Sequence, residues 1–535
     1  MKSFTRRACE MLEKHGELIR VKEPVQPDLL MPAIARRAFA KGMPAIFFEN
    51  VIGSSFPAVC NLFGSEKRAK LLLGGELNFF SRAFHALPLK SFSKPVMQRE
   101  IKLEDLPQIK CWPRDGGAFL TLPQVLTIEP GKKSWRHSNL GMYRVQISGN
   151  DYVQNEECGL HYQIQRGIGV HHQQALAKGA KLKVSIFVGG PPGNALAAIM
   201  PLPNGIPELT FAGMFSKRAF RYAWREGWFI STDADFCILG EVQDGLKPEG
   251  PFGDHLGYYS EMHPFPYLKV HKVFARKDAV FPFTVVGRPP QEDTIFGNII
   301  HRITAPLIPR VLPGVHEVNA VDAAGVHPLL LALGSERYLP YKKREPLELL
   351  VQSNAILGFG QLSLAKYLFI AAKEDNQNLS VRNIPAFFEH ILCRLNLERD
   401  VHIQNSTSID TLDYSGTSLN RGSKAVFAAA GEPCRELGEA SPIKGILVVQ
   451  GNKLETQENA GQFPIAVLCD DANFTAKNLE NLLWVVFTRS NPASDISFNG
   501  TQLIIDARKK PHHSAELEED EETAAEVEKM VNNFY

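Results

Sequence analysis

The sequence contains no paired cysteine motif. Its eight cysteines are scattered along 535 residues, and no two of them are spaced as C-x-x-C. Zinc knuckles and a dense disulfide framework are therefore not expected. Buried free thiols in a reducing compartment fit this cysteine usage better.

The sequence also has neither a strong net charge nor a long apolar run. The formal net charge is +1, so no overall field attracts nucleic acid or an anionic membrane. Residues 1–13 carry charge but lack the apolar core of a secretory signal. Residues 355–372 are the most apolar later stretch, but Gln361, Ser363 and Lys366 interrupt them. We therefore expect a soluble, cytoplasmic protein without a nucleic-acid partner.

The chain is long enough for two or three domains, because one compact core rarely grows to 535 residues. At the N-terminus, Ser3 is placed to cap a helix that Gly16 ends. Strand patterns at 18–21 and 45–48 flank a helical pattern at 28–40. This alternation predicts a small α/β layer.

The middle of the chain, from about residue 106, contains short strand patterns separated by glycine and proline. These patterns lie at 143–147, 183–188, 236–239, 267–274 and 281–286. Many short strands with few helical periods between them predict a barrel or a sandwich.

Beyond about residue 334 the alternation of strands and helices returns. Residues 465–468 form an apolar strand pattern, and a helix capped by Asn473 or Thr475 is expected to follow it. Residues 516–522 are highly acidic, which favours a solvated helix or a frayed tail.

The segment Asn139-Leu-Gly-Met-Tyr-Arg144 is the first that carries chemistry. If residues 143–148 form a strand, Tyr143 and Arg144 point to opposite faces. An arginine on the inner face of a barrel needs an anion, and a phosphate or carboxylate suits its forked donors. The alternative is an edge strand with Arg144 in solvent.

Three histidines lie close together at His161, His171 and His172. Their proximity invites a metal site, but their spacing matches no common zinc motif. Surface or hydrogen-bonded histidines are the expectation here.

A proline-rich turn follows over residues 197–205, where Pro201 and Pro203 disfavour a helix. Glu208 is expected to enter a strand after this turn. If its carboxylate points inward, it needs a cation or a hydrogen-bond donor. A solvent-facing carboxylate is the alternative.

Two carboxylates, Glu249 and Asp254, lie five residues apart with Gly250, Pro251 and Gly253 between them. A straight strand sends these side chains to opposite faces, whereas a rigid, glycine-bent loop aims both into one pocket. Such convergence suits a proton donor with a supporting base. An ordinary Gly/Pro turn with polar residues remains the alternative.

Taken in order, these segments resemble the UbiD family, whose members remove CO2 from unsaturated or aromatic acids with prenylated FMN and a divalent metal. The resemblance extends from the N-terminal helix to about Lys510. The matching stretches are N-x-G-x-Y-R at 139–144, I-M-P-x-P at 199–203, E-G-P-F-G-D-H at 249–255, G-R-P-P at 287–290, W-x-x-x-T-R at 484–489 and I-D-A-x-x-K at 505–510.

The resemblance implies an α/β (α+β) fold in four parts. These are an N-terminal α/β segment at 1–105, a split β-barrel domain for prenylated FMN at 106–325, a C-terminal α/β oligomerisation domain at 326–510 and an acidic tail at 511–535. A homo-oligomer, either a dimer or a hexamer, is expected.

The resemblance also implies a set of site residues. Asn139 and Glu208 would bind the metal, because the oxygen ligands of these two side chains suit a hard cation. Mn2+ is the expected ion, Mg2+ or another divalent cation is the alternative, and K+ is a further candidate. Arg144, Glu249 and Asp254 would be catalytic, with Asp254 as proton donor and a raised pKa for at least one of the two carboxyls. The residues expected to bind the cofactor are Met142, Tyr143, Arg144, Tyr162, Gln163, Arg166, Gly167, Met200 and Lys366.

Two positions qualify the expected function. Gln165 stands where many relatives carry a histidine ligand, so the affinity of the site for a metal is in question. With Asp254 as its acid, the chain is more similar to the hydroxybenzoate-type members. The resemblance implies decarboxylation of an aromatic or α,β-unsaturated acid in ubiquinone or menaquinone biosynthesis. A flavin prenyltransferase would supply the cofactor, and a prenylated substrate would bring peripheral membrane contact. The alternatives are the reverse reaction, another acid, or a cofactor-binding protein with little or no catalysis.

Overall fold

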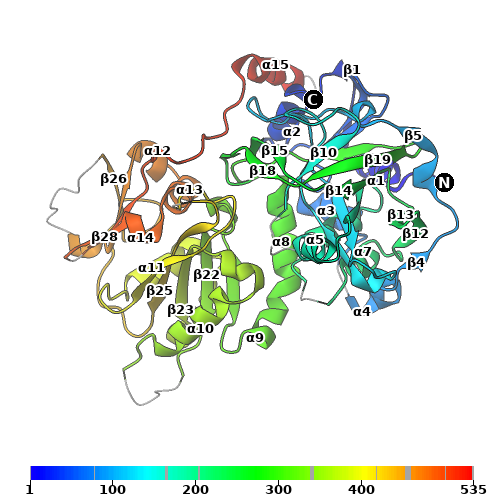
Figure 1. The fold of residues 1–535 in the computed structure, drawn as a ribbon. Helices are drawn as coiled ribbons and strands as arrows, with labels where there is room; N and C mark the ends of the chain where they lie inside the picture. Colours follow the sequence, from blue (N-terminus) through cyan, green and yellow to red (C-terminus); the bar gives the residue numbers. More distant parts are fainter. Residues whose placement is uncertain are drawn as a thin grey trace. The chain divides into compact units, whose positions relative to one another are not determined.

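The structure, a computed structural model, describes residues 2–76, 79–162, 167–202, 205–337, 343–416, 418–451, 460–500 and 502–532. The chain forms two compact units, which we call unit 1 and unit 2 (Figure 1). Unit 1 consists of Met1–Asp254, Tyr258–Phe296 and Glu516–Tyr535, and unit 2 of His255–Gly257 and Gly297–Ala515. The finer division into four parts stays a prediction.

The N-terminal layer of unit 1 forms as expected. Ser3 caps the first helix by accepting a hydrogen bond from the Arg6 N–H, and Gly16 follows the helix in a left-handed conformation that suits glycine. The elements are α1 (Phe4–Lys14), β1 (Leu18–Val25), α2 (Leu30–Ala40), β2 (Ala45–Val51), β3 (Ala58–Cys60) and α3 (Glu66–Leu72). The first two strands pair in parallel, as the α/β alternation predicts.

One strand of this layer comes from far along the chain. β20 (Phe281–Phe283) pairs in parallel with β3, which gives the sheet order β1-β2-β3-β20. From the local pattern alone, residues 281–286 are expected among the strands of the barrel. Local patterning shows that a strand forms there, but only tertiary contacts decide which sheet it joins.

The central sheet of unit 1 has nine strands, in the order β6-β9-β10-β19-β14-β11-β7-β8, with β5 paired to β19. Its ladders are antiparallel. The strands are β5 (Arg99–Ile101), β6 (Phe119–Leu120), β7 (Gln124–Ile128), β8 (Ser138–Gly141), β9 (Val145–Gln146), β10 (Glu157–Leu160), β11 (Lys183–Val188), β14 (Phe236–Val242) and β19 (Tyr267–Ala275). The strand expected at 143–147 is therefore shorter, and Tyr143 and Arg144 immediately precede it.

Short elements connect and cover the central sheet. The helices are α4 (Phe79–Arg82), α5 (Gly167–Ala177), α6 (Pro192–Ala198) and α7 (Glu208–Phe215). The remaining strands are β4 (Leu89–Lys90), β12 (Arg221–Arg225), β13 (Trp228–Ser231), β15 (Lys247–Glu249), β16 (Phe252–Gly253), β17 (Tyr259–Ser260) and β18 (His263–Phe265). β15 pairs with β18 and β16 with β17, so the segment with Glu249 and Asp254 is folded into two small hairpin ladders.

The helix α7 corrects one expectation. Glu208 was predicted to enter a strand, but it is the first residue of α7, directly after Pro207. Pro207 lies outside the helix with φ −68° and ψ 132°, an extended conformation that suits the residue before a helix. A carboxylate in the first turn is also favoured by the partial positive charge of the helix N-terminus.

The described strands of unit 2 form two sheets. The first has the order β21-β22-β23-β25-β24 and the second β26-β27-β29-β28. The strands are β21 (Glu317–Ala320), β22 (Leu329–Gly334), β23 (Tyr367–Ala372), β24 (Val401–Ser408), β25 (Arg421–Ala429), β26 (Ile446–Gln450), β27 (Ile465–Cys469), β28 (Ile496–Asn499) and β29 (Gln502–Asp506). β22, β23 and β25 pair in parallel, and β22 and β23 are buried throughout, as parallel strands covered on both faces are.

Helices accompany both sheets of unit 2, and α8 (Glu292–Thr304) runs from unit 1 into unit 2. The others are α9 (Ile308–Val311), α10 (Leu347–Leu357), α11 (Ile384–Leu392), α12 (Ala472–Ala476), α13 (Leu479–Arg489) and α14 (Pro492–Asp495). The expected cap at Asn473 or Thr475 is wrong, because two helices form: Asp471 caps α12, and Asn478 caps α13. None of the helices in the described ranges is long and apolar enough to cross a membrane.

The acidic end of the chain returns to unit 1 as α15 (Glu521–Asn532). Most of this helix is solvated, as expected, but Val527 and Val531 are buried. α15 contacts α2, where Arg37 and Lys41 form ion pairs with Glu528 at 2.9 and 3.0 Å. The tail is therefore a docked helix.

Candidate active site

Arg144 lies at the centre of a buried ionic cluster in unit 1. Its Nε and Nη2 donate to the two carboxylate oxygens of Glu249 at 2.8 and 2.7 Å. Its Nη1 donates to Asp254 Oδ2 at 2.7 Å. Only 8% of the Arg144 side chain is exposed, which rules out the solvent-facing alternative. One guanidinium therefore binds both carboxylates, in the forked geometry that suits arginine.

The backbone between the two carboxylates explains how both reach the same arginine. Gly250 has φ +88°, a left-handed conformation that ends β15 in a bend. Its N–H donates to Gln146 Oε1 at 3.0 Å. Arg144 and Gln146, two residues apart, therefore both contact this segment. The expected glycine-bent loop is present.

The pKa of Glu249 is set by a balance between burial and the groups that contact its carboxylate. Burial raises the pKa of this carboxyl, but the Arg144 charge and the hydrogen bonds from His161 and Arg144 outweigh burial and hold its pKa at about 2. A raised pKa for at least one carboxyl of the pair stays a prediction, which Asp254 would have to fulfil, because the pKa of Glu249 is lowered. The reason is that Arg144 lies between the two carboxylates, so Glu249 interacts first with a cation.

His161 is a member of the cluster that sequence reasoning missed. Its Nδ1 lies 3.0 Å from Arg144 Nη2 and 3.0 Å from Glu249 Oε2, and its ring packs on Phe265. Burial and the Arg144 charge lower the pKa of His161, so its neutral form is favoured. Ser260 Oγ also accepts from Arg144 Nη2, at 2.9 Å. The clustering of histidines drew attention to His161 but not to this role, because its contact with Glu249 and that of Ser260 with Arg144 join segments 88 and 116 residues apart.

The other two histidines confirm the expectation of hydrogen-bonded rings. His171 Nδ1 lies 2.8 Å from Thr127 Oγ1, and His172 Nδ1 lies 2.5 Å from the Tyr162 hydroxyl. Among the described residues, no group of three or more His, Cys, Asp and Glu side chains is arranged to hold a metal ion. The three histidines therefore belong to separate contacts.

Asn139 and Glu208 come together at the other end of the same segment. Glu208 Oε2 accepts a hydrogen bond from the Leu140 N–H at 3.0 Å, which places it beside Asn139 in the chain. The Asn139 Oδ1 is close to Gly167, where an added Cβ would lie 2.0 Å from it. Burial raises the pKa of Glu208, although the N–H groups of Leu140 and of Glu208 itself oppose this effect.

Asn139 and Glu208 carry the oxygen ligands that a hard cation requires. Asn139 can offer its amide Oδ1, and among the described residues only burial and two backbone N–H groups act on the Glu208 carboxyl, with no lysine or arginine beside it. Glu208 is partly buried, where a carboxylate without a cation is unfavourable, and carboxylate and amide oxygens are ligands of divalent metals. The residues present therefore fit a divalent cation. The expected further donor, Gln165, lies outside the described residues.

Several residues expected to bind the cofactor lie near these two clusters. The Met142 N–H donates to the carbonyl of Ala198 at the end of α6, at 2.9 Å, and Met200 follows in the adjoining turn and is buried. The rings of Tyr143 and Tyr162 are 6.5 Å apart, edge to face. Gln163 and Arg166 lie outside the described residues. Binding roles for all of these residues stay predictions.

Lys366 lies in unit 2 and is almost fully buried there. Its Nζ is 2.7 Å from Asp413 Oδ2 and donates to Ser415 Oγ at 2.6 Å. Burial lowers the pKa of this ammonium, and Asp413 opposes that effect. Its ammonium is thus engaged inside unit 2, and its contact with the cofactor stays a prediction.

Comparison with known families covers most of the chain. Residues 9–86 match the N-terminal domain of the 3-octaprenyl-4-hydroxybenzoate carboxy-lyases, residues 88–289 their Rift-related domain and residues 294–429 their C-terminal domain. A 4-hydroxybenzoate decarboxylase subunit of Chlamydia pneumoniae is 36% identical over 594 aligned residues, covering 100% of this chain and 98% of that protein. An uncharacterized protein of Chlamydia caviae is 35% identical over 600, covering 100% and 99%.

Solved structures share the fold at lower identity. The vanillic acid decarboxylase of Sedimentibacter hydroxybenzoicus has a TM-score of 0.71 at 22% identity, covering 85% of this chain and 95% of that chain. The UbiD-class enzyme HmfF of Pelotomaculum thermopropionicum, in complex with FMN, has a TM-score of 0.64 at 20% identity, covering 80% and 94%. Since all three domains and whole-length relatives agree, the chain belongs to the UbiD family of carboxy-lyases.

Proposed function

We propose that this protein decarboxylates an aromatic acid of the hydroxybenzoate class, using prenylated FMN and a divalent metal. The observation that carries the proposal is the pairing of Arg144 with both Glu249 and Asp254 at 2.7–2.8 Å. A prenylated hydroxybenzoate, as a precursor of ubiquinone or menaquinone, is the first candidate substrate. The name of the Chlamydia pneumoniae relative, which is that of a 4-hydroxybenzoate decarboxylase, supports the hydroxybenzoate class.

The three charged residues have distinct roles in this proposal. With its pKa held at about 2, Glu249 stays ionised at neutral pH and fixes the Arg144 guanidinium by two parallel bonds. The remaining Nη1 orients the Asp254 carboxyl. Phe252, whose ring centroid lies 4.7 Å from Arg144 Cζ, covers one face of the guanidinium and excludes water there.

Proton balance assigns the last step to Asp254. The substrate carboxylate leaves as CO2, and its electron pair remains on the substrate carbon. The Asp254 carboxyl gives its proton to that carbon and then recovers a proton from water, which its 12% exposed side chain allows. When bound, prenylated FMN supplies an electron sink for the departing carboxylate.

Asn139 and Glu208 would hold the metal, and the metal would add positive charge for the phosphate of the cofactor. Met142, Tyr143, Tyr162, Gly167 and Met200 would line the cofactor. Gln163, Arg166 and Lys366 complete the proposed set. We also propose that the protein works as a homo-oligomer in the cytoplasm and receives its cofactor from a flavin prenyltransferase.

The test is co-expression with a flavin prenyltransferase, followed by a visible spectrum and a screen for CO2 release from hydroxybenzoates, prenylated hydroxybenzoates and acrylic acids. Release from a hydroxybenzoate is the expected result. Release from acrylic acids alone would replace the substrate class. A spectrum of the bound modified flavin without release from any acid would favour a cofactor-binding protein, and carboxylation under high bicarbonate would indicate the reverse reaction.

A further inference from the structure

The segment that carries Glu249 and Asp254 rests on a second loop, residues 111–116, which we call the support loop. Asp115 in this loop is 6% exposed. Its Oδ1 accepts from the Gly253 N–H at 2.7 Å, and its Oδ2 accepts from the N–H groups of Cys111 and Trp112, each at 3.0 Å. One buried carboxylate thus joins the backbone of the support loop to the residue directly before Asp254.

The two loops also fit closely where they meet. The Gly116 N–H donates to the Pro251 carbonyl at 2.8 Å. A Cβ added at Gly116 would lie 2.1 Å from the Gly250 carbonyl oxygen, and one at Gly253 would lie 2.1 Å from Trp112 Cδ1. Because both contacts leave no space for a side chain, a small shift of the support loop moves the segment above it.

The bonds of Asp115 match the ionised carboxylate. Three N–H groups point at its two oxygens, so each oxygen is used only as an acceptor. Burial raises the pKa of Asp115 to about 6, although the N–H groups of Gly253, Trp112 and Cys111 oppose that rise. At neutral pH the carboxylate form therefore predominates.

We propose that Asp115 is a positioning residue, which holds the Gly253 peptide so that Asp254 meets Arg144 in the geometry that proton transfer requires. Asp115 acts through backbone N–H groups, whereas Arg144 binds Asp254 directly. The same peptide carries Phe252, which covers the guanidinium. The inference rests on the proposed function, because it assigns Asp115 to the proton-transfer step.

Asp115→Asn tests the proposal with little change in volume. The amide keeps one acceptor oxygen, but its NH2 group faces a backbone N–H donor. The hydrogen bond to Gly253 or those to Cys111 and Trp112 are therefore lost. We expect kcat per bound flavin to fall about 10- to 100-fold, because small displacements of a catalytic group have effects of that size, while KM changes less than about twofold. Amide hydrogen exchange across residues 250–258 is expected to become faster.

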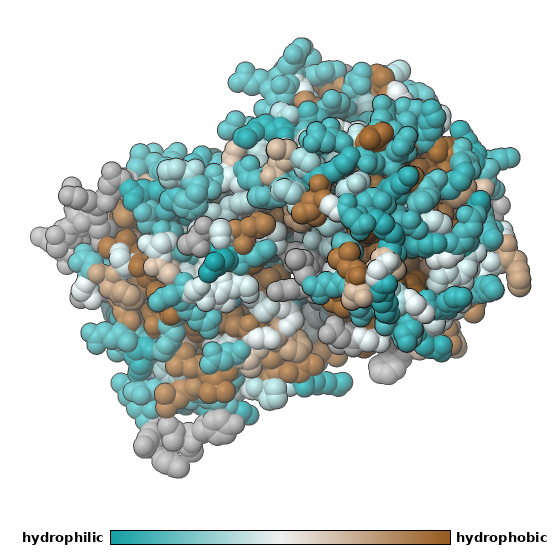
Figure 2. Space-filling view, viewed as in Figure 1, coloured by the Kyte–Doolittle hydropathy of each residue, from teal (hydrophilic) through white to brown (hydrophobic). Residues whose placement is uncertain are grey.

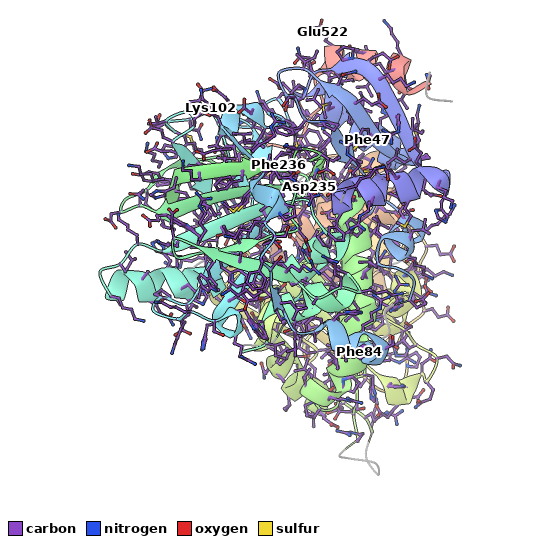
Figure 3. All side chains as sticks on the ribbon, turned by 90° about the vertical axis from the view of Figure 1, so that its right-hand side faces the viewer. Phe47, Phe84, Lys102, Asp235, Phe236 and Glu522 are labelled. Atoms are coloured by element: carbon purple, nitrogen blue, oxygen red, sulfur yellow. The ribbon has the colours of Figure 1, made fainter. Side chains whose placement is uncertain are left out.

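Asp235→Asn is the matched control. Asp235, labelled in Figure 3, is also a buried carboxylate in unit 1. It accepts from the N–H groups of Gly190 and Val280 and from Thr5 Oγ1. Its bonds hold other parts of the fold, so the control is expected to lower the melting temperature and leave kcat per folded, loaded enzyme and exchange at 250–258 unchanged.

The possible results distinguish failure of the positioning role of Asp115 from failure of the proposed decarboxylase function. Unchanged exchange at 250–258 in Asp115→Asn, faster exchange with normal kcat, or equal kcat loss in both variants overturns the positioning role. If the loaded wild type releases CO2 from no acid, the proposed function fails, whereas the exchange comparison still decides whether Asp115 holds the segment. If Asp115→Asn does not fold, Asp115→Ser keeps one acceptor and is measured in the same way.

Discussion

At the residue scale, Arg144 shows how one side chain organises acid–base chemistry. Its three nitrogens all contact partners, and the two carboxylates receive different shares: two bonds for Glu249 and one for Asp254. Glu249 is fully buried, whereas the Asp254 side chain is 12% exposed. This asymmetry is consistent with the proposed roles, in which Glu249 is the fixed anion and Asp254 carries the exchangeable proton.

Asp254→Asn is expected to abolish turnover, with a loss of at least about 100-fold, because the amide has no acidic proton to give. Cofactor binding is expected to persist, since this side chain contacts Arg144 in our assignment and not the cofactor phosphate. Flavin content and CO2 release, measured on the same preparation, check both parts. Loss of the flavin from the variant would contradict the assigned role.

The lowered pKa of Glu249 determines how the stability of the folded protein is expected to change in acid. Its pKa is depressed from an ordinary value of 4.5 to about 2, so its contribution is complete above pH about 4.5 and is lost as pH falls toward 2. A shift of that size corresponds to on the order of 3 kcal/mol. Melting curves of wild type and Glu249→Gln should therefore differ most near neutral pH and converge below pH 4.5. A constant difference would show that Glu249 is not paired in the folded protein.

At the scale of secondary-structure elements, α15 shows how an acidic tail becomes part of a folded unit. Val527 and Val531, four residues apart, present one buried stripe, and the acidic residues cover the other side. Glu519, just before α15, pairs with Arg36 at 3.0 Å, and the Arg36 guanidinium lies 3.9 Å from the ring centroid of Trp112 in the support loop. The tail is thus connected, through Arg36, to the support loop beneath Glu249 and Asp254.

Removal of α15 by a stop after Asp520 is expected to destabilise unit 1 by about 3 kcal/mol, the burial of two valine side chains. The exposed ion pairs of α15 add little to this value. A lower melting temperature by calorimetry is the measurement. Glu522→Gln, on the outer edge of the same helix (Figure 3), should leave it unchanged. An equally stable truncated protein would mean that α15 does not dock in solution.

At the scale of the whole molecule, unit 2 has exposed apolar side chains on α9 and α10, which bear on the proposed homo-oligomer. Leu347 and Val351, one helical turn apart on α10, are 53% and 69% exposed, and Val311 of α9 is 44% exposed. Figure 2 shows hydrophobic residues gathered where Figure 1 places α9 and α10. Exposed apolar clusters of this kind commonly mark contacts between protomers.

Val351→Asp is therefore expected to reduce the oligomer to a smaller species, because an interface between protomers would bury its charge without a partner. Light scattering coupled to size-exclusion chromatography measures the mass. Phe498→Ser, at a 53% exposed position on β28 of the same unit, is the control and should leave the mass unchanged. If both variants keep the wild-type mass, α10 does not form the interface between protomers.

Local pattern alone determined a large part of this protein. The cap at Ser3, the parallel β1 and β2, the buried strand at β27 and the bend at Gly250 all follow from short-range preferences that the residues carry wherever they lie. The pairing of Arg144 with the carboxylates was expected from family motifs, since 105 and 110 residues separate these partners in the chain.

Only the tertiary structure decided the features that depend on which distant segments meet. His161 bonds Glu249 and Asp115 bonds Gly253, and these partners lie 88 and 138 residues away in the chain. The place of β20 in the N-terminal sheet and the return of α15 to α2 are long-range choices of the same kind. The pKa of Glu249 also depended on tertiary structure, because the direction of its shift is set by the balance between burial and the Arg144 cation that the fold brings beside it.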